Sequence, residues 1–178
     1  MEMTGERTLT VNRATAWAAL NDVNLLQTTI PGCESIAASA ENEYDLVMNA
    51  AIGPVKARFK GRMSLTDVDA PRQYTIRFDG QAGQAGFARG QAKVSLDEQG
   101  SQHTLLRYAV TAQVGGRLAQ AGSRLIDAAA ASMADQFFAG FSNHLSAATT
   151  AAPSGRTKLG RWSLLLSFIK RLFKGSKA

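Results

Sequence analysis

Residues 118–145 read LAQAGSRLIDAAAASMADQFFAGFSNHL, and their pattern organises the rest of the chain. Apolar side chains recur at steps of seven and four, which places them on one face of a helix of about thirty residues. They are Leu118, Leu125, Ala129, Met133, Phe137, Phe141 and Leu145. At about 1.5 Å per residue, such a helix spans roughly 45 Å and can lie across a whole β-sheet.

The residues before this helix carry a period of two, which is typical of antiparallel strands with one buried face. The clearest segment is 55–65, where apolar side chains alternate with Lys56, Arg58, Lys60 and Arg62. Turn-forming residues interrupt the pattern at 41–42, 53–54, 69–71, 80 and 98–100. We therefore expect a meander of antiparallel strands between residues 33 and 113.

The N-terminal segment predicts a strand followed by two short helices. Asn12 is a favourable N-cap for the helical spacing of Ala14, Trp17 and Leu20, and a second short helix over 21–29 ends before Pro31. The resulting order is strand, two short helices, strand meander and long helix. This order predicts an α+β fold in which a curved antiparallel sheet of six to seven strands grips the long C-terminal helix.

The C-terminal residues differ in composition from the rest. Residues 146–155 contain only Ser, Ala, Thr, Pro and Gly, so we divide the chain into a domain over 1–145, a flexible linker over 146–158 and an amphipathic basic helix over 159–178. The last 23 residues hold seven of the 20 Lys and Arg residues and no acid, which leaves 13 basic against 14 acidic residues in the body. A body of this charge argues against nucleic-acid binding.

Four stretches resemble one known family: PGCESI at 31–36, GPVKARFKG at 53–61, GFARGQAKVSL at 86–96, and VGGRLAQAGSRLID at 114–127 followed by DQFFAGF. The chain over about 1–145 is similar to the CoxG family of carbon monoxide dehydrogenase accessory proteins, which belongs to the START-like (SRPBCC) superfamily. The resemblance implies a helix-grip fold, a hydrophobic cavity between sheet and long helix, and an accessory role for a cytosolic molybdenum hydroxylase.

Small residues between Gly83 and Gly90 fit either a tight helix contact or the wall of a ligand pocket, and the resemblance favours the pocket. The predicted cavity residues come from the inward strand faces, the glycine-rich segment and the long helix. They are Met48, Phe59, Met63, Tyr74, Phe78, Gly86, Phe87, Tyr108, Ala129, Met133 and Phe137. A quinone is the favoured ligand, because it is apolar and can take electrons from such an oxidoreductase, and a lipid is the alternative. No covalent cofactor is expected.

The sequence predicts no catalytic residue and no metal site. Its two histidines, His103 and His144, lie in no Cys/His or carboxylate cluster, and Cys33 has no cationic neighbour that would lower its pKa. The alternatives are a cyclase or hydrolase acting on an apolar substrate in the same cavity, and an assembly adaptor without ligand. An enzyme would need an acid or base, and the apolar strand faces offer only tyrosines.

Two surfaces are expected to bind partners. Lys56, Arg58, Lys60 and Arg62 form a cationic ladder suited to docking an acidic partner protein. The tail is expected to bind an anionic membrane surface through Trp162, Leu165, Leu166, Ile169, Lys170, Arg171, Leu172, Phe173 and Lys174. With one cysteine and no apolar run in residues 1–10, the expected location is the cytoplasm, at the inner face of the cell membrane.

Overall fold

The computed structural model describes residues 1–150, with side chains described through residue 147. Its elements are β1 (Glu2–Leu9), α1 (Arg13–Leu20), α2 (Val23–Thr29), β2 (Cys33–Ala40), β3 (Glu43–Ile52), β4 (Val55–Asp69), β5 (Gln73–Gln81), η1 (Gly83–Ala85), β6 (Phe87–Glu98), β7 (Thr104–Gly115), η2 (Gly116–Ala121) and α3 (Ser123–Thr150). The expected α+β helix-grip architecture is confirmed.

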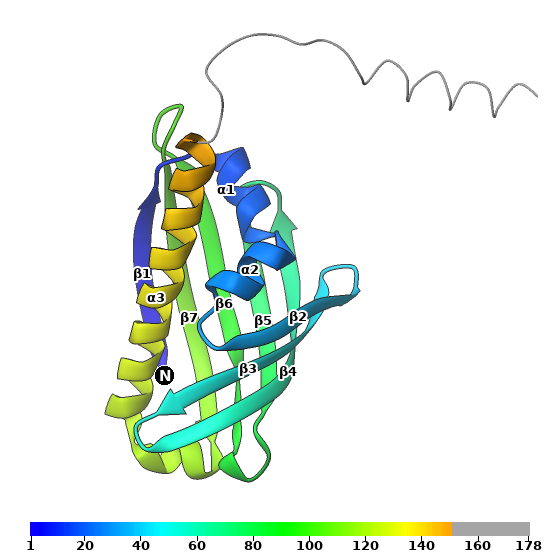
Figure 1. Cartoon of the computed structure of the whole chain (residues 1–178), viewed down its shortest axis with the longest axis vertical. Helices are drawn as coiled ribbons and strands as arrows, with labels where there is room; N and C mark the ends of the chain where they lie inside the picture. The colour runs from blue at the N-terminus through cyan, green and yellow to red at the C-terminus, as the bar shows by residue number, and fades with distance from the viewer. Residues whose placement is uncertain (151–178) are drawn as a thin grey trace, which may run out of the picture.

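The strands form one antiparallel sheet in the order β1-β7-β6-β5-β4-β3-β2. Strands β2 to β7 follow one another as a meander, and β1 joins it by pairing with β7. The first two strands therefore lie at opposite edges, and α1 and α2 connect them. Figure 1 shows the sheet curving so that the β3–β4 hairpin comes round towards the first turns of α3. Leu125 of α3 lies against Gly53 in that hairpin.

The two short helices begin where the sequence provides an N-cap. The side chain of Asn12 accepts a hydrogen bond from the backbone N–H of Thr15, as expected for a cap of α1. The carboxylate of Asp22 accepts from the N–H groups of Asn24 and Leu25 at the start of α2. These caps let the chain cross the concave side of the sheet in two short helices rather than one.

The long helix begins later than its apolar pattern predicts. Gly122 adopts φ +89°, a conformation that interrupts a right-handed helix, so residues 116–121 form a separate 3₁₀ turn. The step of seven from Leu118 to Leu125 crosses this break, and Leu125 is consequently 44% exposed. Ile126 and Phe138 are buried instead. At the other end, α3 continues over 146–150, which the composition had assigned to the linker, because Ser and Ala without Gly or Pro can extend a helix.

One turn expectation is also wrong. Gly80 lies inside β5, where it pairs with Gly61 and Ala88, and the chain reverses over residues 82–86 instead. Gly86 has φ +123°, and a Cβ built there would lie 1.9 Å from the carbonyl oxygen of Gly115. The glycine at 86 thus lets the backbone of the β5–β6 connection pass close to the backbone at the end of β7.

Candidate functional site

The buried apolar side chains form two separate clusters instead of one continuous core. The upper cluster joins β1, β5, β6, β7, α1, α2 and the second half of α3, and includes Leu9, Ala16, Leu25, Leu106 and Phe141. The lower cluster joins the β3–β4 hairpin, η2 and the start of α3: Ile52, Ala57, Phe59, Leu118 and Ile126. Small domains usually have one contiguous core, so the division calls for an explanation.

A cavity of about 490 Å³ occupies the space that the inward side chains leave between the sheet and α3. Inward-facing residues in its middle, such as Leu46, Met63, Phe78, Val110 and Met133, are only partly buried and belong to neither cluster. Its volume falls in the range of about 300–1,000 Å³ typical of small-molecule sites. The cavity therefore explains why the core is divided.

Most of the predicted cavity residues line this space. Those that do are Met48, Phe59, Met63, Tyr74, Phe78, Tyr108, Ala129, Met133 and Phe137. They come from β3, β4, β5, β7 and α3, which the fold brings to one concave surface. Whether they hold a ligand stays a prediction.

Two predicted residues, Gly86 and Phe87, do not line the cavity. Val94 and Leu96 are buried on the inner face of β6, so the period of two places odd-numbered residues of that strand on the outer face. The ring of Phe87 lies there, over Gly115 and beside the guanidinium of Arg89, whose carbon is 5.3 Å from the ring centroid. Because the even-numbered residues Val94 and Leu96 face inward, the period of two already predicts that Phe87 faces outward and does not line the cavity.

The sequence reasoning missed one wall of the cavity. Residues in and directly after the two short helices line it: Leu20, Asn21, Leu26, Ile30 and Pro31. Met1 and Met3 at the start of the chain line it as well. The apolar residues Leu20, Leu26 and Ile30 predict that one face of these helices is buried, but their spacing does not indicate which part of the sheet that face covers.

The cavity wall is mainly apolar, with a few polar exceptions. The lining residues with polar or charged side chains are Asn21, Tyr44, Arg62, Tyr74, Asp79 and Tyr108. Arg62 contacts Asp45 at 3.4 Å, and Asp79 accepts from the amide of Gln81 at 2.9 Å. Burial raises the pKa of Tyr74 well above its ordinary value, and nearby Tyr44 adds to the effect. Tyr74 is thus a neutral hydroxyl at any physiological pH.

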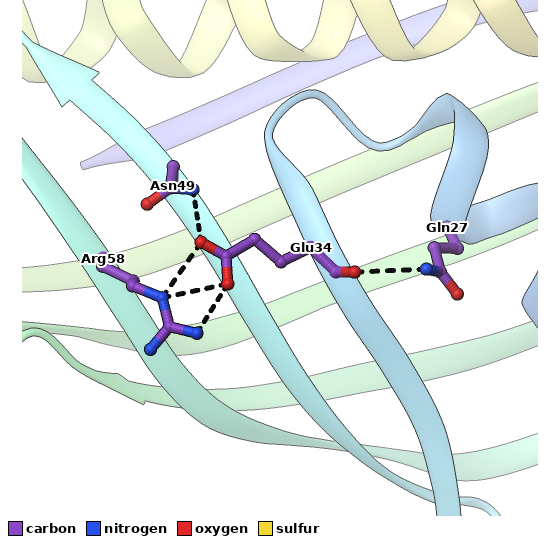
Figure 2. A network of polar contacts seen from close by, with 4 residues as sticks. All are labelled: Gln27, Glu34, Asn49 and Arg58. Atoms are coloured by element: carbon purple, nitrogen blue, oxygen red, sulfur yellow. Dashed lines mark hydrogen bonds and ion pairs between the residues drawn. The ribbon is translucent and has the colours of Figure 1, made fainter.

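The cationic ladder lies on the outer face of β4, but it is not uncompensated. The guanidinium of Arg58 binds the Glu34 carboxylate through three contacts of 2.6–3.0 Å, and Asn49 donates to the same carboxylate (Figure 2). These hydrogen bonds lower the pKa of Glu34 below its ordinary value, and those from Arg58 have the largest effect. Within residues 1–150, Lys56 and Lys60 are the ladder cations without an ion pair. The acids come from β2 and β3, which local spacing in β4 does not reveal.

The other titratable groups singled out from the sequence lie away from the cavity. His103 and His144 are exposed. Cys33 is partly buried, and burial raises the pKa of its thiol. Within the described part of the chain, no three His, Cys, Asp or Glu side chains lie close enough together to hold a metal ion.

The predicted membrane-binding residues, from Trp162 to Lys174, lie outside the described residues. Among residues 1–150, no helix is long and apolar enough to cross a membrane. The tail therefore remains a prediction from sequence.

A curved antiparallel sheet, a long C-terminal helix across it and an apolar cavity between them define the helix-grip fold of START-like proteins. Solved structures share it. A conserved protein from Geobacillus kaustophilus is 25% identical, with a TM-score of 0.77 over 82% of this chain and 95% of that one. A START superfamily protein from Mycobacterium smegmatis is 11% identical, with a TM-score of 0.63 over 82% and 97%. The Zhui aromatase/cyclase from Streptomyces sp. R1128 is 10% identical, with a TM-score of 0.62 over 87% and 99%.

The family model for CoxG, described as a subunit of carbon monoxide dehydrogenase, matches residues 5–146. The chain belongs to this family, as the four sequence stretches indicated. Comparison with curated proteins finds no match.

Proposed function

We propose that this protein is a non-enzymatic carrier that holds an apolar molecule in the cavity and serves a molybdenum hydroxylase of the carbon monoxide dehydrogenase type. The observation that carries the proposal is the cavity of about 490 Å³ that divides the core. Leaving such a space empty forfeits packing energy, so a fold that keeps it open has a use for it. The family name supplies the oxidoreductase as partner.

The side chains around the cavity support binding rather than catalysis. Both histidines are exposed, and Cys33 is not among the lining residues. Tyr74 keeps its proton, since burial raises its pKa. A tyrosine of this kind is a poor general base at neutral pH.

A quinone is our favoured ligand. A quinone is apolar enough to fit the mainly apolar cavity wall, and it accepts electrons. It also dissolves in lipid, so it can carry electrons from a cytosolic oxidoreductase into the membrane. The basic, apolar sequence of residues 159–178 would hold the carrier at an anionic membrane surface, where each cation contributes about 1 kcal/mol. Lys56 and Lys60 would face the acidic partner protein.

The direct test is to purify the full chain from native-like membranes, extract it with organic solvent and identify the extract by mass spectrometry. We expect one apolar redox molecule in near-stoichiometric amount. The control is Ala134→Trp, prepared identically, because Ala134 lines the cavity and belongs to neither packed cluster. Equal recovery from both proteins, or no apolar molecule from the wild type, contradicts the proposal.

A further inference from the structure

Tyr74 combines near-complete burial with a place on the cavity wall. It is 5% exposed and lies in the upper packed cluster. Its ring meets that of Trp17 edge-on, with centroids 5.3 Å apart and planes at 78°. Because Trp17 belongs to α1, on the concave side of the sheet, the phenol ring of Tyr74 lies on the cavity side of β5.

Among the described residues, the hydroxyl of Tyr74 takes part in no hydrogen bond. The one fully enclosed side-chain nitrogen or oxygen without a partner in this part of the chain is Nε of Arg13, so the tyrosine hydroxyl is not sealed inside the packing. Tyr74 is 5% exposed and is one of the residues that line the cavity.

The remaining polar side chains of the wall are less suited to bind a ligand tightly. The amide of Asn21 already donates to the carbonyl oxygen of Trp17 at 2.8 Å. Tyr108 stacks on Phe138, with centroids 5.4 Å apart, and its hydroxyl lies over Gly5 of the edge strand. Tyr44 is partly buried and close enough to Tyr74 to influence its ionisation. Tyr74 is the most buried donor of the wall, and Tyr44 is a polar neighbour.

An unpaired hydroxyl in apolar surroundings lacks the hydrogen bonds that water would supply. A ligand that brings an acceptor oxygen to it restores one of them, whereas a pure hydrocarbon does not. A site with such a donor therefore discriminates by chemistry as well as by shape.

We propose that the Tyr74 hydroxyl donates a hydrogen bond to a carbonyl oxygen of the bound molecule and so selects apolar ligands with a carbonyl at one end. That end lies beneath α1 and α2. The apolar remainder extends along Met63, Phe78 and Met133 towards the lower cluster. The inference rests on the proposed carrier function and adds the orientation and the class of its ligand.

The test uses two probes of nearly equal shape on the full chain: 2-methyl-1,4-naphthoquinone, which has carbonyl oxygens, and 2-methylnaphthalene, which has none. Tyr74→Phe removes only the donor. We expect it to weaken quinone binding about tenfold and to leave binding of the hydrocarbon unchanged. Thr75→Val is the matched control: it removes a buried hydroxyl next to Tyr74 on β5 at a residue that does not line the cavity, and it should bind both probes as the wild type does.

Two further readouts separate a binding role from a structural one. The infrared carbonyl stretch of the bound quinone should lie at lower frequency in the wild type than in Tyr74→Phe. The ligand-free Tyr74→Phe protein should melt no lower than the wild type, because the hydroxyl has no internal partner to lose.

The outcomes distinguish this inference from the proposed function. If the wild type binds neither probe, the carrier function itself fails. If it binds both and Tyr74→Phe changes neither affinity, or changes both equally, the cavity binds apolar molecules but Tyr74 does not select them. A lower melting temperature of ligand-free Tyr74→Phe would reveal an internal hydrogen bond and would also overturn the inference.

Discussion

Arg58 and Glu34, 24 residues apart in sequence, are joined through both carboxylate oxygens and two guanidinium nitrogens. The register shift between Cys33 and Ser35 at the start of β2 accompanies this contact. The amide of Gln27 donates to the Glu34 carbonyl, so the same residue also connects α2 to the sheet (Figure 2). This network fixes the point where the chain passes from the helices into the meander.

The same network predicts a pH-dependent contribution to stability. The pKa of Glu34 is lower in the folded protein than its ordinary value of 4.5, so the contribution is present above that value and is lost as the pH falls through the folded pKa. Glu34→Gln should melt below the wild type at pH 7, and the difference should shrink as the pH falls below about 4.5. Thermal unfolding across this range measures it. Glu41→Gln, an exposed change in the next turn, is the control for the loss of a surface charge and should melt as the wild type does at pH 7.

The divided core predicts that the wall tolerates a large side chain. Ala134→Trp places an indole in the cavity and should change the free energy of unfolding by less than about 1 kcal/mol. Ala16→Trp is the matched control, because Ala16 is 0% exposed in the upper cluster. Overpacking there should cost about 1–3 kcal/mol or more. Equal destabilisation in urea unfolding would mean that the space around Ala134 is already filled.

The outer face of β4 predicts an electrostatic docking effect. Changing both Lys56 and Lys60 to Glu should alter stability by less than about 1 kcal/mol per site, because both are exposed. It should nevertheless slow association with the oxidoreductase at low salt. Lys93→Glu, on the outer face of β6, is the control for a general charge effect. If the control slows association as much as the double variant, the docking face is not centred on β4.

The tail sequence predicts a separable membrane anchor. Deleting residues 156–178 removes seven cations and no side chain of either packed cluster, so the remaining chain should fold. It should no longer sediment with vesicles containing phosphatidylglycerol, whereas the full chain should. Vesicles of phosphatidylcholine alone are the control for purely apolar binding. If the truncated chain still sediments with anionic vesicles, the membrane-binding residues lie within residues 1–155 and not in the tail.

The fold was predictable because its signals are local. Alternation in residues 55–65, the cap at Asn12 and the apolar stripe of the long helix each depend on near neighbours in the chain. The wrong predictions occur where a single residue changes how the periodic pattern of the sequence maps onto a helix or strand. Gly122 interrupts the helix and leaves Leu125 exposed, and Gly80 continues a strand that its residue type suggested would end.

The site was predictable only in part, because a cavity is a property of several elements together. Strand parity identifies Met63 and Phe78 as inward residues, but it does not distinguish a side chain that contacts a neighbour from one that faces empty space. The unpaired hydroxyl of Tyr74 and the pairing of Arg58 with Glu34 both depend on groups distant in sequence. Composition and periodicity carry no information about such pairs.

Part of the cavity wall belongs to neither packed cluster, and this has a consequence for sequence divergence. A wall residue such as Met63 can change size without removing a contact that either cluster needs, so a substitution there alters the shape of the cavity at little cost to folding. The shape of the cavity and the stability of the fold can then vary nearly independently among related chains. The same backbone arrangement in proteins only 10–25% identical to this one is compatible with such freedom.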